Sequence, residues 1–243
     1  MSDAVADPSD RTLDDTDAAI VPAAEVEFDQ VTDVVVAGAG GCGLTATLAA
    51  ADAPDVEVIL LEKASTVGGN AALSTGMIPA AGTSYQQAAG ITETPAEMAA
   101  DIMAKNDEEA DASMVQHLCE TSVELVHWLV EDCGLSLQIV DDFKYPQHSE
   151  YRMHAPPGRN GENLVAEMRD RIQSRPNTEL RLETPVERLV TDDGAVQGVL
   201  TGGEQPAAIR ARRVILGTDG FAGNSEMVGA HCDADIADAF YYG

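Results

Sequence analysis

Positive charge is scarce in this sequence. Its 14 lysines and arginines, only three of them lysines, stand against 42 acidic residues, and the formal net charge is −28. Such a charge repels polyanions, so nucleic-acid binding is not expected. The acidity has two interpretations: it keeps the protein soluble, or it adapts the protein to a high-salt cytoplasm, where the Debye length falls to about 3 Å at 1 M salt. The scarcity of lysine and the abundance of aspartate favour the halophilic interpretation.

Sequence signals for disulfides, metal ions, membranes and secretion are also missing. The cysteines Cys42, Cys119, Cys133 and Cys232 form no C-x-x-C pair and no spacing typical of a metal site. No apolar run approaches the roughly 18 residues of a membrane span, and the N-terminus lacks the basic start and apolar stretch of a secretory signal. We therefore expect a protein of the reducing cytoplasm, without a disulfide framework, metal site or membrane span.

The sequence does contain a glycine-rich turn with both of its required flanks. Thr32–Gly43 reads TDVVVAGAGGCG, a β-branched run that leads into the pattern G-x-G-x-x-G, and an Ala/Leu-rich helical pattern follows at once. A second apolar run, Val56–Leu61, ends in Glu62, nineteen residues after the last glycine of the turn. Strand, turn, helix, strand and acidic residue in this order are typical of a dinucleotide-binding unit.

Each glycine of the turn has a physical role in such a unit. Gly38 permits the tight turn, Gly40 lets the backbone approach a pyrophosphate, and Gly43 lets the helix pack closely on the strand. The free N–H groups and the dipole at the helix N-terminus attract phosphates, and Glu62 can accept hydrogen bonds from ribose hydroxyls. A βαβ unit that binds nothing is the alternative. These residues do not distinguish FAD from NAD, because both contain an ADP half.

The residues after Glu62 indicate the cofactor. Lys63–Gly82 is a long loop of small residues where a nicotinamide-binding fold would normally begin another helix, and such a loop can lie against a flat ring system. Here the sequence resembles the flavoprotein subunit family of fumarate reductase and succinate dehydrogenase, in its soluble branch. The resemblance runs from about Thr32 to the last residue, and the motifs that carry it are Gly38–Gly43, Glu62-Lys63, Gly68–Asn70, Ser74–Gly76 and Val214–Phe221.

This resemblance implies a set of residues that contact FAD. The glycine turn would meet the pyrophosphate, Glu62 the adenosine ribose, and the small-residue loop the ribityl chain and flavin ring. Val186 would lie by the adenine, and the chain would return to the cofactor around Asp219, where the family more commonly has glycine. The implied cofactor-binding residues are Gly38, Ala39, Gly40, Gly41, Cys42, Gly43, Glu62, Lys63, Gly69, Asn70, Ala71, Thr75, Gly76, Val186, Thr218, Asp219 and Gly220.

The resemblance also concerns how FAD is held and where catalysis occurs. Membrane-complex relatives attach FAD through a histidine in the loop after the glutamate, whereas no histidine occurs here between Glu62 and His117, so non-covalent FAD is expected. The family's catalytic arginine and substrate-holding residues belong to regions that follow Gly220–Asn224, and this sequence stops at Gly243. We therefore expect no catalytic residue within it, and a fragment, a truncated gene product or one half of a split enzyme.

The predicted fold is α/β: a Rossmann-like FAD-binding βαβ sheet with an inserted helical segment and a small antiparallel β-meander. Residues 1–30 are predicted to be a disordered acidic arm, and residues 31–243 an incomplete FAD-binding domain that lacks the cap, or substrate, domain. Residues 135–151 are expected to be irregular. Periodicity and caps predict helices over 95–106, from 111 or 113 to about 131, and over 161–174, and meander strands over 186–190, 196–200 and 209–216.

A basic cluster in this acidic chain has two open interpretations. Arg152-Met-His154 is followed by Pro156–Arg159, and relatives carry a similar Arg-x-His-x-Pro stretch. The cluster could support the flavin or contact an anionic substrate. Alternatively, it is a structural tie to nearby carboxylates.

The predicted function is the FAD-binding portion of a flavin-dependent oxidoreductase. The complete enzyme would transfer hydride between flavin N5 and a C=C or CH–CH group next to a carbonyl or carboxylate, like a fumarate reductase or a 3-ketosteroid dehydrogenase. Its partner would be a small molecule that bears such a group. One alternative is a non-catalytic FAD-binding subunit, or a truncated remnant, that needs a partner chain to supply the cap. A weaker alternative is an NAD-binding module.

The charge generates the first prediction. Because like charges crowd the surface of a chain with a net charge of −28, the melting temperature should rise steeply from dilute buffer to about 2 M KCl, where screening weakens self-repulsion. Thermal scans in KCl and in sulfate at matched ionic strength separate screening from strengthened apolar burial. Equal melting temperatures in dilute buffer and KCl would reduce the acidity to a solubility feature.

Overall fold

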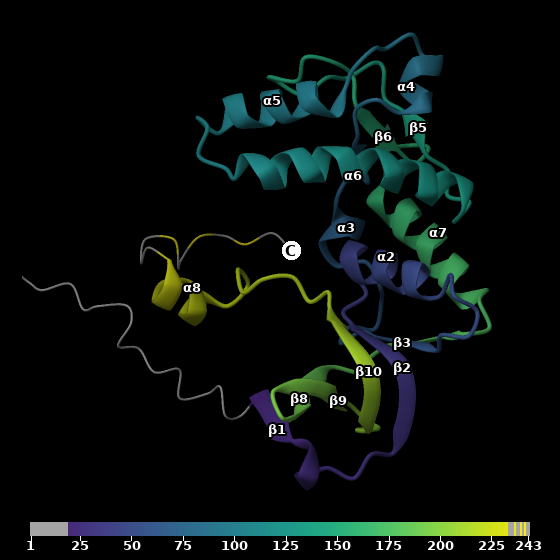
Figure 1. Ribbon diagram of the computed structural model, residues 1–243, viewed down its shortest axis with the longest axis vertical. Helices are drawn as coiled ribbons and strands as arrows, with labels where there is room; N and C mark the ends of the chain where they lie inside the picture. Colours follow the sequence, from purple (N-terminus) through teal and green to yellow (C-terminus); the bar gives the residue numbers. More distant parts are fainter. Residues whose placement is uncertain (1–18, 233–235, 237–238, 240, 242–243) are drawn as a thin grey trace, which may run out of the picture.

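The computed structural model describes residues 19–232 together with residues 236, 239 and 241. Its main element is a seven-stranded sheet with the strand order β1-β8-β9-β10-β2-β3-β7, which lies in the lower half of Figure 1. In chain order these strands are β1 (Ile20–Pro22), β2 (Gln30–Ala37), β3 (Val58–Leu61), β7 (Thr178–Arg181), β8 (Val186–Asp192), β9 (Ala195–Thr201) and β10 (Ala208–Leu216).

The strands β10, β2, β3 and β7 are parallel. A parallel sheet buried on both faces favours continuous apolar runs, and all four residues of β3 are buried. The helices α2 (Gly41–Ala50) and α7 (Gly161–Gln173) lie on one face (Figure 1). The core on that face includes Val36, Leu44, Leu48, Leu60 and Ile172. Alternate strand residues point to the opposite face, where Val35, Ile59 and Leu61 pack with Val199 and Ile209.

The predicted β-meander is present as β8, β9 and β10. Neighbouring strands are antiparallel from β8 to β9 and from β9 to β10. The strand β10 then pairs in parallel with β2 over its length, from Ile209 opposite Gln30 to Leu216 opposite Ala37. The meander therefore continues the parallel sheet, because its last strand belongs to both. After β10 the chain leads through a coil to α8 (Ser225–His231), which Figure 1 shows at a distance from the sheet.

The inserted segment is helical, as predicted, and its helices begin at capping residues. The helix α5 (Pro95–Lys105) follows a capping box between Thr94 and Glu97, and α6 (Ala112–Glu131) is capped by Asp111. Such caps satisfy N–H groups that the first turn leaves unpaired. The segment also contains α3 (Gly69–Leu73), α4 (Ser84–Ala88) and a three-stranded sheet β4-β6-β5, formed by Ile78–Pro79, Met153–Ala155 and Gln138–Ile139.

Four parts of the chain differ from the sequence prediction. The expected acidic arm does not extend to residue 30, because Ile20–Pro22 pairs in parallel with β8 and Ala23–Glu25 forms a 3-10 helix; residues 1–18 lie outside the described residues. The strand β7 was not predicted, since its sequence TELR has no apolar alternation, and pairing with β3 holds it. The expected loop after Glu62 contains α3, and the segment expected to be irregular contains β5.

Candidate cofactor-binding site

The turn between β2 and α2 has no room for larger side chains at two positions. Gly38 has φ +92°, and a Cβ there would lie 2.6 Å from the carbonyl oxygen of Gly217. A Cβ on Gly43 would lie 1.7 Å from the carbonyl oxygen of Gly38. The amide of Gly38 also donates to the carbonyl of Leu61 at 2.7 Å, which ties the turn to the end of β3. The predicted roles of these two glycines in the turn and in helix–strand packing agree with this geometry.

The first turn of α2 fits a diphosphate. Its N-cap residue, Gly40, makes no side-chain hydrogen bond to the helix, and the first turn contains no acidic residue. A Cβ on Gly40 would meet only the carbonyl oxygen of Gly68, at 3.9 Å, so its outer side is open to a ligand. Gly41 and Cys42 begin the helix, and Cys42 is exposed. Free N–H groups and the positive end of a ten-residue helix suit a polyanion at this point.

Glu62 is fixed beside that turn. Its Oε2 accepts a hydrogen bond from the amide of Ala39 at 2.7 Å, and its Oε1 accepts one from the amide of Ala64 at 2.8 Å. Each carboxylate oxygen keeps acceptor capacity, so the fixed carboxylate can also bind hydroxyl groups of a ribose. The carbonyl of Glu62 accepts from the amide of Thr184 at 2.8 Å, which places the segment before Val186 next to Glu62. Lys63 is exposed.

The small-residue loop lies against the same turn. The amide of Gly68 donates to the carbonyl of Ala39 at 2.8 Å, and Gly40 and Gly68 form an isolated parallel bridge. Asn70 and Ala71 belong to α3, the short helix that follows.

Further along this loop, close packing against α7 fixes the chain. A Cβ on Gly161, the first residue of α7, would lie 2.1 Å from the carbonyl oxygen of Ala71. Thr75 is exposed, whereas Gly76 is buried with φ +66° against Pro156. The loop is thus held by the helix behind it and leaves Asn70 and Thr75 exposed to a ligand.

The chain returns to the turn after β10. The amide of Gly217 donates to the carbonyl of Ala37 at 2.8 Å, and the Cα of Thr218 lies 3.3 Å from the Cβ position of Gly38. Asp219 has φ +64°, in the left-handed region that glycine favours and aspartate tolerates. Gly220 has no neighbour within 4 Å of its Cβ position. The structure therefore brings the turn, the loop after Glu62 and the return segment to one edge of the sheet.

One interaction at this edge was not predicted from the sequence. The side-chain amide of Asn70 donates to Asp219 Oδ2 at 2.8 Å and lies 3.2 Å from the hydroxyl of Tyr241. That hydroxyl is 3.5 Å from the same Asp219 oxygen. Asn70 and Asp219 are 149 residues apart in the chain, so no local pattern could have indicated their contact.

The arginine of the basic cluster is a structural tie. The buried Nη2 of Arg152 pairs with Glu93 Oε1 and with Asp101 Oδ2. Burial raises the pKa of Glu93, although bonds from Gln86 and Arg152 oppose the rise. Burial also acts to raise the pKa of Asp101, but hydrogen bonds from Ser149 and Arg152 together hold it below its usual value. Of the two interpretations of the cluster, the tie to nearby carboxylates is confirmed for Arg152.

His154 of the same cluster is fully buried and bonded on both nitrogens. Nδ1 lies 3.1 Å from the carbonyl oxygen of Arg152, and Nε2 lies 2.9 Å from the hydroxyl of Thr83. A neutral ring protonated at Nδ1 satisfies both contacts, because it donates to the carbonyl and accepts from the hydroxyl. Burial lowers the pKa of His154 to about 4. The ring is therefore neutral near pH 7 and has no free nitrogen for a substrate.

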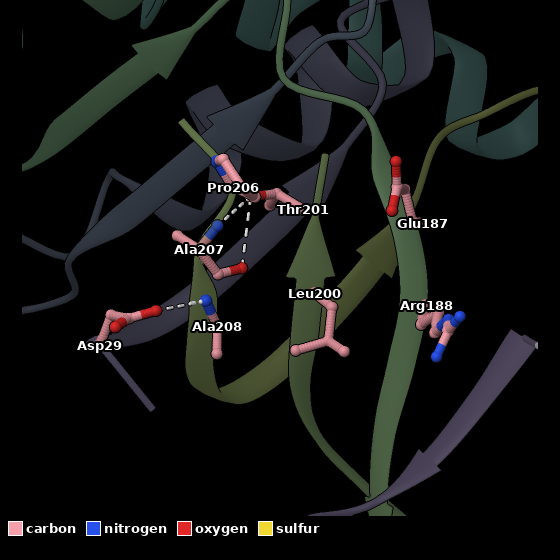
Figure 2. A pocket seen from close by; sticks show the side chains of 8 residues that line it. All are labelled: Asp29, Glu187, Arg188, Leu200, Thr201, Pro206, Ala207 and Ala208. Carbon is pink, nitrogen blue, oxygen red and sulfur yellow. Dashed lines mark hydrogen bonds between the residues drawn. The ribbon is translucent and has the colours of Figure 1, made fainter. Parts of the chain in front are cut away.

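Two cavities are lined by residues outside the glycine turn. One has a volume of about 290 Å³ and lies where the meander meets the start of β2; Figure 2 shows its lining residues, Asp29, Glu187, Arg188, Leu200, Thr201, Pro206, Ala207 and Ala208. Because β2 runs eight residues from this end to the turn, the two are roughly 25 Å apart. The other cavity, of about 330 Å³, is lined by residues 138–140 and 155–159. Neither contains a predicted cofactor-binding residue.

Two features are absent from the described part of the chain, a cluster of metal-binding side chains and a membrane-spanning helix. There, no group of three histidine, cysteine, aspartate or glutamate side chains is placed to hold a metal ion. None of the helices described is long and apolar enough to cross a membrane.

Comparisons with known proteins agree with this geometry. The model of the FAD binding domain family matches residues 33–238. Urocanate reductase from Eggerthella lenta is 33% identical over 211 residues, which cover 85% of this chain and 34% of that protein. The structure of the open conformation of a flavocytochrome c3 fumarate reductase has a TM-score of 0.80 at 30% identity. That match covers 89% of this chain and 38% of the reductase chain.

A further solved structure is similar over much the same region. The 3-ketosteroid-Δ4-(5α)-dehydrogenase from Rhodococcus jostii RHA1 has a TM-score of 0.76 at 31% identity. That match covers 88% of this chain and 51% of the dehydrogenase chain. The chain spans about a third of the length of the curated relatives it matches. Together the matches confirm the predicted FAD-binding fold, and FAD rather than NAD as the cofactor.

The geometry of Glu62 generates the second prediction. Replacing Glu62 with Gln removes the charge and turns an amide NH2 toward the N–H of either Ala39 or Ala64. Since hydrogen bonds to charged groups contribute about 1.5–3 kcal/mol, FAD affinity should fall roughly ten- to a hundredfold. Direct titration with FAD measures the change. The matched control is Glu57→Gln, which alters an exposed residue just before β3 and should leave FAD affinity unchanged. Unchanged FAD affinity in Glu62→Gln would contradict a contact between Glu62 and the ribose.

The burial of His154 generates the third prediction. The unfolded chain takes up a proton near the ordinary histidine pKa of 6.5, whereas the folded chain resists it down to about pH 4. The free energy of unfolding should therefore fall as the pH drops from about 6.5 to 4, by about 3 kcal/mol from this group. Urea unfolding across this range should show a smaller pH dependence for His154→Gln than for the wild type. His117→Gln, at an exposed position, should retain the full dependence; equal slopes in all three proteins would refute the assignment.

Proposed function

Because the chain belongs to the FAD binding domain family, we propose that it is the FAD-holding portion of a flavin-dependent oxidoreductase. The complete enzyme would act on a C=C or CH–CH group next to a carbonyl or carboxylate. The observation that carries the proposal is the fixed contact of Glu62 with the amide of Ala39. This contact sets a hydroxyl-binding carboxylate beside a helix N-terminus suited to a diphosphate.

The residues of this edge would divide the work of holding FAD. The N–H groups of Gly41–Gly43 would bind the diphosphate, and Glu62 the adenosine ribose. The segment at Val186 would lie beside the adenine, because the residues just before it are hydrogen-bonded to Glu62 and Ala64. Asn70 and Asp219 would lie on the side away from the ribose. None of these contacts needs a covalent bond, and non-covalent binding is part of the proposal.

Bound FAD supplies hydride transfer at its N5 to or from a carbon of an activated C–C bond. The chain's residues would position the ring for that chemistry. The loop at Thr75 and Gly76 is fixed by its packing on Pro156 and α7, and the amide of Gly76 donates to Ser74 Oγ, so any donor that the rest of the loop offers the ring would be held in place. Donors that need no rearrangement stabilise charge most effectively.

The class of substrate is proposed from the names of the relatives. Those relatives are reductases of urocanate and fumarate, and a dehydrogenase of 3-ketosteroids. Urocanate and fumarate carry a C=C bond next to a carboxylate, and a 3-ketosteroid carries a carbonyl that can activate a neighbouring C–C bond. A small molecule with such a group is the proposed substrate.

A second candidate function is a non-catalytic FAD-binding subunit that depends on a partner chain. Arg152 and His154 are buried and offer no proton donor to a substrate, which agrees with both candidates, because the first also places the catalytic residues outside this chain. Both candidates place FAD in the same site, and they differ in whether a substrate is turned over.

The fourth prediction tests the site and then the activity. The purified chain should take up FAD and become yellow, and acid precipitation should release the chromophore into the supernatant because no residue is bonded to it. Flavin in the pellet would contradict non-covalent binding. A chain that stays colourless with excess FAD would contradict the proposed function.

Activity separates the two candidates. Oxidation of a dithionite-reduced viologen by fumarate, urocanate or a 3-ketosteroid with a ring C=C bond should be absent with the 243-residue chain alone. It should appear when further chain equivalent to the rest of the relatives' length is supplied, in one polypeptide or by co-expression. The Glu62→Gln variant of the longer protein is the control for flavin dependence. A longer protein that binds FAD without turning over any of these compounds would favour the non-catalytic subunit.

A further inference from the structure

The order of strands fixes on which side of the glycine turn each half of FAD must lie. The turn follows β2, whose neighbours are β3 on one side and β10 on the other. Glu62 follows β3, and Asp219 lies three residues after the end of β10. If the diphosphate lies at the first turn of α2 and the adenosine ribose at Glu62, the flavin half extends toward β10. This placement of the flavin half rests on the proposed binding of FAD.

Asp219 and Asn70 meet on that flavin side. The contact at 2.8 Å between Asn70 Nδ2 and Asp219 Oδ2 joins the loop after β3 to the segment after β10. Both segments are also fixed to the turn, through the bridge between Gly40 and Gly68 and through the approach of Gly217 to Gly38. Both side chains are exposed at this edge, so a ligand on the turn can reach them.

At Asp219 a side chain stands in a backbone conformation that glycine adopts more freely and that aspartate tolerates. With φ +64° this residue occupies a conformation that glycine adopts freely and that costs other residues free energy. Gly217 and Gly220 stand on either side of Thr218-Asp219, and a third glycine would relieve the strain. The carboxylate provides what glycine cannot, an acceptor for the Asn70 amide and a negative charge.

We propose that Asp219 is a positioning residue for Asn70 and, in addition, a fixed negative charge that lowers the reduction potential of the bound flavin. By accepting from the amide NH2 group, Asp219 sets the orientation of the Asn70 side chain. Reduction adds electrons to the flavin ring, so a carboxylate on the flavin side disfavours the reduced form. The protein would thereby hold a more strongly reducing flavin than a relative with glycine at this position.

The size of the effect follows from Coulomb's law. If the carboxylate and the flavin ring lie about 10 Å apart, their unit charges, at an effective dielectric constant of about 20, interact by roughly the free energy that corresponds to a tenfold change in an equilibrium constant. For a two-electron couple, tenfold corresponds to about 30 mV. Molar salt should reduce this effect, because it screens exposed charges.

The experiment is a measurement of the midpoint potential of the FAD-loaded chain against a reference dye. Asp219→Asn keeps the size of the side chain and an oxygen that accepts from Asn70, but removes the charge. It should raise the potential by about 30 mV in dilute buffer, and by clearly less in about 2 M KCl. Asp219→Gly relieves the backbone strain as well as the charge, and should raise the potential at least as much. Relative to the wild type, the FAD affinity of Asp219→Gly should change less than that of Glu62→Gln.

Asp193→Asn is the matched control. Asp193 is an exposed aspartate that also has positive φ, 46°, in the turn between β8 and β9, and its replacement should leave the potential unchanged. A purely structural Asp219 would give the wild-type potential in both Asp219→Asn and Asp219→Gly, and that result would overturn the inference while FAD binding stands. An equal shift in Asp193→Asn would assign the effect to net charge and would also overturn it. A wild-type chain that takes up no FAD would overturn the proposed function together with this inference.

Discussion

The edge proposed to bind the cofactor depends on one close backbone approach, that of Gly43 to the carbonyl of Gly38. A Cβ at Gly43 would come within 1.7 Å of that oxygen, so any side chain would force α2 away from β2. With α2 in place, the Cβ position of Gly217 lies 3.0 Å from the amide of Gly43, and Gly68 bridges to Gly40. Three segments that are distant in the sequence can therefore converge on one helix N-terminus.

This construction suits an acidic chain that binds an anionic cofactor. A net charge of −28 opposes the approach of a diphosphate. The proposed site would offer it the amides and dipole of α2, whose first turn has no acidic residue. Glu62 lies beside the turn, and its two oxygens accept hydrogen bonds from the amides of Ala39 and Ala64. Backbone N–H groups can thus bind an anion despite the repulsion from the protein's net negative charge. They act at hydrogen-bonding distance, whereas most surface charges are farther away and screened by salt.

The inserted segment shows that charge in the interior serves packing. The Arg152 guanidinium joins Glu93, which follows α4, to Asp101 on α5, and Gln86 on α4 donates to Glu93 Oε2 at 2.9 Å. Because the charges are buried, removing one partner would leave the others without compensation, which is far more destabilising than loss of an exposed pair. The network therefore links the helices of the insertion to β6, and the insertion is held by a polar core as well as by apolar contacts.

The sequence by itself determined the features that depend on short spacings. The glycine turn with its flanking strand and helix, Glu62 at the end of the next strand, the cap of α6, and the meander were all predicted, because each is encoded by residues a few positions apart. The family resemblance added FAD. Only the tertiary structure decided that Arg152 and His154 are buried ties, that β1 and β7 join the sheet, and that Asn70 meets Asp219. These depend on burial and on pairs more than a hundred residues apart, which the folded sheet brings together and no local pattern records.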